Sequence, residues 1–558
     1  MRFSLLLASA ASLLTLAACS ETRQAASGSP DGGTLVIATP TDADVLLPPL
    51  AATQLSREVC DQVFDHLAEI GDSLQTIGDA GFTPRLAQRW DWARDSLSIA
   101  FHIDPKARWH DGQPVRASDV RFTVALYKNP KLASPFTPQV ANIDSASVRD
   151  SLTAVVWFHQ RRPEAFYDIA YQVAILPEHL LRDIAPEKLM TSQFARHPVG
   201  TGRFRFARWD AGSRLELVAD TANYRGRAHL DRVVYTITPD NNTGFTQLLS
   251  GQADLFEITT PDQLAQLKGN AKVRAFPYPS LQYAFMGFNL HDPKQPARPH
   301  PIFGDARVRR AISMALDRRG MLRNVFDTLG AIAYGPFPRS LGSADTTLRL
   351  PPFDTTHAAA LLDSLGWKRG ADGMRARDGH PLAFTLQVPT SSRVRMTYAT
   401  LIQDQLRRLG ITVDIGGMQF PEFMAHQDAR DFDASLNAYS TDPSPGGYTQ
   451  NWGSGGAHKG GSNSVGYSNP VFDALLDSAL TSFDPARARA YAVRAYQVLA
   501  DDAPAVWLYD VLTVGAISTR IHTAPLRADE WWAHLADWTI PPAERIDRDR
   551  IGLGAAKP

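Results

Sequence analysis

The 558-residue sequence predicts an α/β protein of several domains. Short runs of apolar and β-branched residues, typical of buried strands, alternate with segments whose apolar residues recur at helical spacing. Apolar residues make up 44% and charged residues 21% of the chain, which excludes disorder for most of its length. The sequence shows no internal repeat of about 20 to 50 residues, which argues against a solenoid.

Charge and cysteine content exclude further classes. Lys and Arg number 57 and Asp and Glu 58, so the net charge of −1 favours neither a nucleic-acid footprint nor a polybasic membrane patch. The only cysteines are Cys19 and Cys60, so no intrachain disulfide can form if Cys19 is modified.

The first residues have the pattern of an export signal. A basic Arg2 precedes an apolar stretch over 3–18, which is too short for a comfortable membrane span. The stretch ends in Leu-Ala-Ala-Cys19, which resembles the bacterial lipobox. We therefore expect a lipoprotein signal peptide over 1–18, lipidation of Cys19 and a flexible tether over 19–33. The alternative is an ordinary secretory signal with an incidental cysteine, and the choice between inner and outer membrane stays open.

Hydrophobic patterning predicts the elements that follow the tether. We expect strands over 34–39, 96–103, 213–218 and 232–237, and a helix over 118–127 with Ser118 as its N-cap. Asp305 is expected to cap one helix over 305–324, and Gly366 to end a helix over 358–365. A strand over 382–388, a helix over 398–409 and a strand over 411–415 predict a βαβ unit. Two further helices are expected over 469–482 and 485–501.

Motifs of common enzymes and metal sites do not occur in the sequence. It contains no His-Glu-x-x-His and no Gly-x-Ser-x-Gly, and its 15 histidines are scattered. We predict structural roles for His110, His179 and His197, and no catalytic residue, metal or cofactor. The glycine-rich stretch 453–461 fits either a loop that lines a ligand or a surface turn.

Four segments stand out between about Thr34 and Leu512: WHDGQPVRASDV over 109–120, HPVGTG over 197–202 with NYRG over 223–226, LLSGQADL over 248–255, and DARVRRAI over 305–312 with ALDR over 315–318. Together and in this order, they resemble the family 5 extracellular solute-binding proteins, which serve ABC importers of peptides, nickel and related solutes. The physical features of these segments are turns, helix caps and glycines, so we interpret all four as folding signatures and not as ligand contacts.

The resemblance implies a periplasmic binding protein-like α/β fold. Two lobes and an extra domain (cluster C type), with mixed sheets, would close on a ligand about two strands that cross near 275–280 and 515–518. The implied division is 34–65, 195–280 and 515–558 for lobe I, 66–194 for the extra domain and 281–514 for lobe II.

In peptide-binding relatives, an Asp in an aromatic-x-x-Asp-Pro segment meets the ligand's ammonium group. The segment Tyr439-Ser-Thr-Asp442-Pro443 is similar, which makes Asp442 the expected anchor and Tyr439 a lining residue. The following Ser-Pro-Gly-Gly departs from the Pro-Asp-Pro-like continuation that is usual in the family. A turn residue before proline is the alternative role for Asp442.

Weaker candidates complete the predicted site. Arg393 lies between a strand and a helix, where a guanidinium can meet a ligand carboxylate. Tyr448 and Trp452 have rings that can pack on ligand side chains. Asp42 and Asp44 follow the first strand, where relatives bring the chain to the cleft.

The resemblance implies a receptor without catalytic activity. It would be a monomer, anchored by lipid in the periplasm or cell envelope, that delivers short peptides to an ABC permease of the inner membrane. The alternatives are a carrier of nickel, a haem-type ligand or sugar, a periplasmic hydrolase, and a peptide-sensing lipoprotein or chaperone without its own permease.

Overall fold

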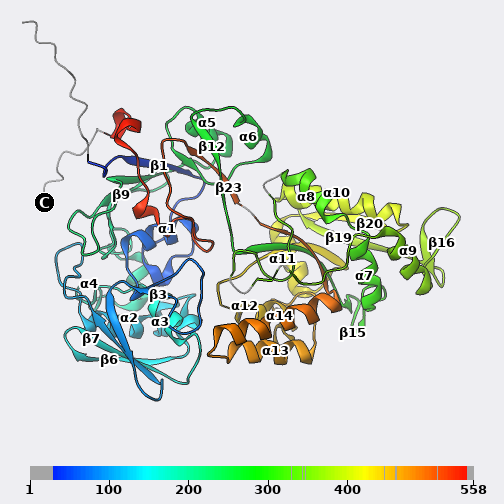
Figure 1. Cartoon of the computed structure of the whole chain (residues 1–558), viewed down its shortest axis with the longest axis horizontal. Helices are drawn as coiled ribbons and strands as arrows, with labels where there is room; N and C mark the ends of the chain where they lie inside the picture. The colour runs from blue at the N-terminus through cyan, green and yellow to red at the C-terminus, as the bar shows by residue number, and fades with distance from the viewer. Residues whose placement is uncertain are drawn as a thin grey trace, which may run out of the picture.

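The computed structural model describes residues 29–549, except 328, 329, 342, 343, 346, 445, 459, 460 and 512. Two sheets organise this part of the chain, one of seven strands and one of five, and each belongs to a different half of the molecule (Figure 1). The predicted signal peptide (1–18), Cys19 and most of the tether lie outside the described residues.

The first lobe is built on the seven-stranded sheet. Its strands follow the spatial order β12 (Val273–Tyr278), β23 (Thr513–Ser518), β11 (Leu255–Phe256), β1 (Thr34–Thr39), β10 (Arg232–Ile237), β9 (Arg214–Ala219) and β8 (Phe204–Asp210). All six residues of β1 are buried, as the unbroken apolar run predicts, because β1 lies in parallel between β10 and β11. Three helices accompany the sheet: α1 (Gln54–Val63), α5 (Asn241–Leu249) and α6 (Pro261–Gln266).

The extra domain is an antiparallel sheet with helix α2 (Ala117–Tyr127) packed against it. Its elements are β4 (Ala87–Trp92), β5 (Ser98–Ile103), β7 (Thr153–Phe158) and β6 (Ile143–Asp150), with the small pair β2 (Ala68–Ile70) and β3 (Phe82–Pro84), and the helices α3 (Ala165–Ala170) and α4 (Glu178–Leu181). The extra domain and the first lobe share one hydrophobic core, which continues into the second lobe through residues such as Phe285, Trp452 and Tyr496. The predicted cap Ser118 is wrong: Arg116 is the N-cap, and its backbone N–H donates to the Asp119 carboxylate at 2.8 Å.

The second lobe is built on the five-stranded sheet and has a core of its own. Its strands follow the order β20 (Thr412–Met418), β19 (Ala383–Pro389), β21 (Ala434–Ser440), β13 (Gln282–Phe288) and β22 (Ala505–Asp510). The predicted βαβ unit is confirmed, since β19 and β20 are parallel and α10 (Arg393–Arg408) connects them. The other helices are α9 (Thr355–Ser364), α11 (Phe420–Ala429), α12 (Gly446–Trp452), α13 (Pro470–Leu480) and α14 (Pro485–Asp502), and the short strands are β14 (His291–Asp292), β15 (Gln295–Pro299), β16 (Lys368–Arg369), β17 (Arg375–Arg377) and β18 (His380–Pro381).

The single helix predicted over 305–324 is wrong. The chain forms two helices, α7 (Ala306–Met314) and α8 (Arg318–Phe326), separated by a break at 315–317. Asp305 caps the first helix as predicted, but Asp317 caps the second, and its carboxylate accepts the Gly320 N–H at 2.9 Å. A helix-capping side chain inside an amphipathic pattern therefore ended the first helix although the apolar spacing continued.

The chain passes between the two main sheets twice among the described residues. Residues 279–281 connect β12 to β13, and the segment between Asp510 and Thr513 connects β22 to β23. Because β12 pairs with β23 in one sheet and β13 pairs with β22 in the other, the crossings lie side by side. The crossings were expected near 275–280 and 515–518. The first lies close to its expected position, and the second lies a few residues earlier than expected. No helix in the described ranges is both long and apolar enough to span a bilayer.

Candidate functional site

Two adjoining cavities lie between the lobes, next to the crossing strands. The smaller has a volume of about 290 Å³ and the larger about 600 Å³. Both are lined by residues from the two lobes, and they share Arg57, Leu281, Thr441, Asp529 and Glu530. The crevice expected between the lobes is therefore present, and Asp442 lines its smaller cavity.

Asp442 follows strand β21 at the point where the second lobe meets the crossing. A backbone hydrogen bond fixes the position of this segment, because the Thr441 N–H donates to the Leu281 carbonyl at 2.8 Å. The carboxylate of Asp442 accepts the Ser444 N–H at 2.8 Å but forms no ion pair with any described cation. The Asp442 side chain is exposed to solvent at the crevice wall, but the surrounding protein and the negative charge of Glu164 raise its pKa to about 6.

The loop after Asp442 touches the extra domain across the crevice. The Ser444 hydroxyl donates to Glu164 Oε2 at 2.8 Å, and the Thr76 hydroxyl donates to Glu164 Oε1 at 2.7 Å. Asp168 lies on α3, one turn after Glu164, and its buried Oδ2 lacks a hydrogen-bond partner in the described part of the chain. Burial raises the pKa of Asp168 to about 7, although the Arg162 guanidinium lies 3.9 Å from Oδ2, so this side of the crevice carries two carboxyl groups and one distant cation.

The opposite wall of the smaller cavity is also acidic. Asp61 on α1 accepts the Trp532 indole N–H at 2.8 Å. Asp529 accepts from Arg527 Nε at 2.6 Å and from the Tyr171 hydroxyl at 2.8 Å, and Arg527 also approaches Glu530 at 3.2 Å. These side chains are held by the C-terminal segment 519–549, which follows the last strand.

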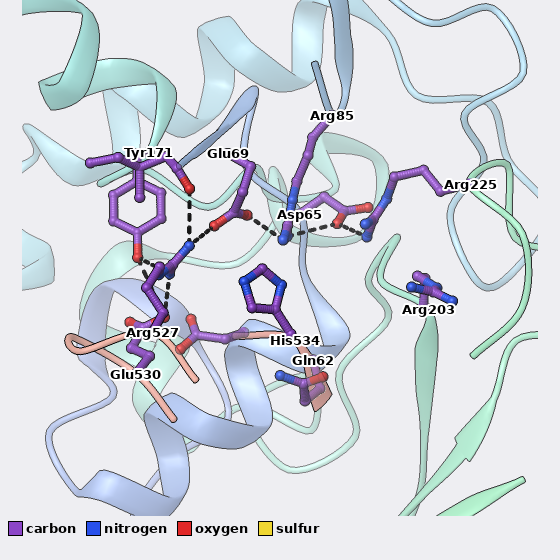
Figure 2. Close-up of polar contacts among 12 residues, drawn as sticks. Gln62, Asp65, Glu69, Arg85, Tyr171, Arg203, Arg225, Arg527, Glu530 and His534 are labelled. Carbon is purple, nitrogen blue, oxygen red and sulfur yellow. Dashed lines mark hydrogen bonds and ion pairs between the residues drawn. The ribbon is translucent and has the colours of Figure 1, made fainter. Parts of the chain in front are cut away.

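Arg527 ends a chain of alternating charges inside the first lobe and extra domain (Figure 2). Arg225 and Arg85 pair with Asp65, Arg85 and Arg527 pair with Glu69, and Arg527 then reaches the cavity wall. Asp65 has no exposed side-chain surface, and the Arg527 side chain is 1% exposed. This chain rigidly positions the backbone that carries Asp529 and Glu530.

Two further groups face both lobes. The guanidinium of Arg57 is exposed, lines both cavities and has no side-chain partner among the described residues. His66 lines the smaller cavity, and burial lowers its pKa to about 4, so the imidazole is neutral at pH 7. Arg57 is thus a cation that the fold leaves available to a bound molecule.

Tyr439, Tyr448 and Trp452 do not line either interlobe cavity. They stand in the aromatic cluster behind Asp442. The Tyr439 ring lies 4.8 Å from that of Phe285, and its hydroxyl donates to the Ser462 carbonyl at 2.9 Å. Trp452 is fully buried and donates from Nε1 to the Tyr283 hydroxyl at 2.9 Å, and Tyr448 is buried as well.

The remaining predicted residues lie outside the two cavities. Arg393 is the first residue of α10, and its exposed guanidinium is 3.4 Å from Asp262 of α6, across from the other lobe. Asp42 accepts from Trp209 Nε1 at 3.0 Å, and Asp44 accepts from the Thr53 hydroxyl at 3.0 Å. The structure therefore brings Asp442 to the crevice, places Arg393 beside the other lobe, and uses Asp42 and Asp44 in local loop contacts.

The family-like segments hold backbone together, as predicted. A Cβ atom on Gly200 would lie 1.8 Å from the Val63 carbonyl oxygen, so only glycine fits there. His110 lies 2.9 Å from the Gly202 carbonyl, and the Asn223 amide donates to the same carbonyl at 2.9 Å. Three segments distant in sequence thus meet at one buried junction away from the cavities.

Sequence reasoning missed Arg57, Asp61, Tyr167, Asp529 and Glu530. The available signals were an Arg and an Asp four residues apart on α1, and two acids directly before Trp531 and Trp532. Neither signal specifies a crevice without the three-dimensional fold. The described residues contain no group of three His, Cys, Asp or Glu side chains arranged to hold a metal ion.

Comparisons with known proteins relate the whole arrangement to one family. The model of the bacterial extracellular solute-binding proteins, family 5 Middle, matches residues 81–460. The oligopeptide-binding protein AppA of Bacillus subtilis is 29% identical over 423 residues, which cover 74% of this chain and 75% of AppA. Heme-binding protein A of Haemophilus influenzae is 25% identical over 517 residues, covering 86% of this chain and 89% of that protein. The structure of B. subtilis AppA in complex with a nonapeptide superposes with a TM-score of 0.70 at 24% identity, covering 91% of this chain and 99% of that one.

Proposed function

Because the chain belongs to the family 5 bacterial extracellular solute-binding proteins, we propose that it captures short peptides between its two lobes for an ABC importer. A relative named as oligopeptide-binding supports the peptide as ligand. The observation that carries the proposal is Asp442, an ionisable carboxylate inside the interlobe crevice without a cation of its own.

The ammonium group of a peptide is the partner that this carboxylate lacks. A peptide enclosed between lobes loses most of its water, so each charged end needs a charged or hydrogen-bonding partner. The raised pKa of Asp442, about 6, reflects the cost of an ionised carboxylate beside Glu164. An ammonium group placed between Asp442 and α3 would remove that cost and would bind both sides of the crevice at once.

Arg57 is the matching group for the other end of the ligand. Its guanidinium is exposed to both cavities and is not neutralised by a described side chain. A guanidinium can hold a carboxylate through two parallel hydrogen bonds. We infer that Arg57 receives the ligand's carboxylate or a backbone carbonyl oxygen.

The aromatic residues predicted for the site have a positioning role in this proposal. Strand β21 delivers Tyr439 to the cluster around Phe285, and α12 inserts Trp452 beneath the loop that carries Asp442. Trp452 and Tyr283 complete a buried hydrogen bond. Because packed aromatic rings resist displacement, this cluster fixes where Asp442 projects.

Closure is a shift between open and closed populations in this proposal. The two crossings supply the hinge, and contacts between the lobes supply the closed state. Such contacts include the hydrogen bond from Ser444 to Glu164 and the Arg161 guanidinium 5.1 Å from the Phe483 ring centre. A ligand that bridges Asp442 and Arg57 favours the closed form because it binds both lobes only there.

The remaining parts of the proposal follow from the sequence. Cys19 carries the lipid, the chain functions as a monomer in the periplasm or cell envelope, and it releases its ligand unaltered to a permease. The domain division is part of the proposal, with lobe I over 34–65, 195–280 and 515–558, the extra domain over 66–194 and lobe II over 281–514.

Matched peptides test the ammonium anchor. For a tripeptide and a nonapeptide, each free or N-acetylated, titration calorimetry should show that acetylation abolishes most of the binding to the wild type. Asp442→Asn should weaken binding of the free forms by about 2–5 kcal/mol, because the ligand's charge then lies buried without a partner. Asp72→Asn, an exposed acid outside the cavities, is the control and should bind like the wild type. Equal binding of free and acetylated peptides would disprove the role of Asp442.

Ligand recovered with the protein tests the solute class. Mass spectrometry of protein purified from its host should identify short peptides. Recovery of only nickel, haem or glycan would establish one of the alternative carriers. Sustained cleavage of peptides, lost on a single substitution, would instead reveal a hydrolase.

A further inference from the structure

The smaller cavity has two acidic sides, and only one of them is explained by the ligand's ammonium group. Asp442 forms the first side. The second side consists of Asp61 from α1 and of Asp529 and Glu530 from the C-terminal segment. Both sides line the same space of about 290 Å³, so one small ligand can contact both.

The second side carries more negative charge than its own cations balance. Arg85, Arg225 and Arg527 are the three guanidinium groups of the ion-pair chain behind the wall (Figure 2). They face five carboxylates, namely Asp61, Asp65, Glu69, Asp529 and Glu530. Among the described residues, Asp61 forms no ion pair and accepts only the Trp532 N–H. The wall therefore has an excess of two carboxylates when all are ionised.

An aromatic pair beside these carboxylates is a separate observation that points to a cation. The rings of Tyr167 and Tyr171 stack with centres 5.7 Å apart, and both residues line the cavity. Tyr167 is only 3% exposed as a residue, but its hydroxyl is not among the buried atoms that lack a partner, so the hydroxyl opens to the cavity, where no described residue forms a hydrogen bond with it. Such a hydroxyl is available to a ligand, and the Tyr167 ring can attract a cation, whereas the Arg527 guanidinium already lies 5.3 Å from the centre of the Tyr171 ring.

Other groups that face this side do not supply the missing charge. Burial keeps His66 neutral at pH 7. Arg57 lines both cavities, as Asp529 and Glu530 do, and is assigned above to the ligand's carboxylate. Burial raises the pKa of Asp61 to about 7 and that of Glu530 well above its usual value, so both carboxyls gain protons while no cation is bound.

We propose that Asp61, Asp529 and Glu530, with the rings of Tyr167 and Tyr171, form a second cation subsite that selects ligands with a basic side chain. This inference rests on the proposed peptide function and names its substrate class. Asp442 binds the backbone ammonium group and the subsite binds the side-chain ammonium or guanidinium group. A polyamine shares this chemistry, and the experiment separates the two sources.

The test compares lysine with norleucine, which has the same straight chain without the charge. Three tripeptides of alanine with one lysine, at the first, second or third position, are titrated alongside their norleucine counterparts. At least one lysine peptide should bind the wild type about tenfold more tightly than its counterpart, because a desolvated charge pair forms. In Asp61→Asn, whose amide oxygen still accepts the Trp532 N–H, that ratio should fall below about threefold.

Further measurements exclude simpler explanations. Asp72→Asn, which changes a residue outside the cavity, should keep the full ratio of lysine-peptide to norleucine-peptide affinity if the preference arises in the cavity. Asp61→Asn together with Glu530→Gln should remove the ratio entirely, and circular dichroism reports whether that double variant folds. The proposal is overturned if the wild type binds lysine and norleucine peptides equally, or if the preference persists in folded Asp61→Asn.

The outcome for peptides in general separates this inference from the proposed function. If Asp442→Asn loses all free peptides while lysine and norleucine bind the wild type equally, the peptide receptor stands and the subsite does not. If no tripeptide binds, the diamine cadaverine tests the subsite alone. Binding of cadaverine that Asp61→Asn weakens supports a polyamine-type cation, and absence of binding overturns the subsite.

Discussion

Asp65 and Asp442 lie on opposite sides of the crevice region and show two uses of one side chain. Asp65 is fully buried behind the first lobe, paired with Arg85 and Arg225 and bonded to the Tyr224 hydroxyl at 3.0 Å. Asp442 lines the crevice without any described counter-charge. Asp65 stabilises the fold through its ion pairs, whereas Asp442 has no charged partner among the described residues and can pair with a ligand.

The comparison teaches where binding capacity lies in this molecule. Every charge in the chain from Arg225 to Arg527 has an opposite charge beside it, so this chain contributes shape and rigidity. Asp442 and Arg57 have no such partners in the described structure, so they can interact with a solute. In this protein, a candidate binding residue is a charged side chain for which the described structure supplies no opposite charge.

Substitution of Asp65 should have the largest effect on folding. Asp65→Asn leaves Arg85 and Arg225 partly buried beside a neutral group, which should lower the free energy of unfolding by about 3–5 kcal/mol. Urea denaturation of the wild type and variant measures this. Asp442→Asn should not lower the free energy of unfolding and should raise it slightly at pH 7, because it breaks no ion pair and removes a carboxylate whose ionised form the fold disfavours.

Peptide affinity should show the reverse order. Folded Asp65→Asn should bind tripeptides within about twofold of the wild type, since Asp65 does not line either cavity. If Asp65→Asn were as stable as the wild type but lost binding, the distinction between the fold carboxylate and the site carboxylate would be wrong.

Features that depend on short stretches of sequence were predicted well. The family-like segments, the βαβ unit around α10 and the strand before Asp442 depend on local patterns of apolar residues, caps and glycines. The location of Asp442 came from the resemblance of a short segment. These are properties that neighbouring residues determine.

Contacts between residues distant in the sequence, the burial of particular side chains and one helix break could not be predicted from the sequence. Asp529 and Glu530 meet Asp61 only because the C-terminal segment returns to the first lobe more than 450 residues later. The rings of Tyr448 and Trp452 could equally line a crevice or pack in a core, and burial decided for the core. The break between α7 and α8 occurs because Asp317 caps a second helix in addition to the one that Asp305 caps, which apolar periodicity does not encode.

The pH dependence of binding sharpens the comparison further. The pKa of Asp442 in the unliganded protein is about 6, and a bound ammonium group requires the ionised carboxylate. Affinity for a tripeptide without charged side chains should therefore be constant between about pH 6 and 8 and fall about tenfold per pH unit below 6. Above pH 8 the peptide's own amine loses its proton and affinity should fall again.

Calorimetry between pH 5 and 8 measures this profile, and Asp442→Asn is its control. The variant has no carboxyl to protonate at this position, so its weaker affinity should be flat between pH 5 and 7. A wild-type affinity that rises as the pH falls to 5 would mean that the protonated carboxyl binds the ligand, and the ion pair would have to be abandoned.

The smallest effect is expected at the mouth of the crevice. Arg393 and Asp262 approach to 3.4 Å across the two lobes, but their side chains are 79% and 83% exposed. An exposed ion pair contributes about 0.2–1 kcal/mol, so Arg393→Ala should weaken tripeptide binding less than about fivefold by making closure slightly less favourable. Asp262→Ala should have the same small effect, and the double variant should be no weaker than either single one, because both changes remove one interaction. A larger loss confined to Arg393→Ala, and absent for peptides with an amidated carboxyl end, would make Arg393 the carboxylate anchor in place of Arg57.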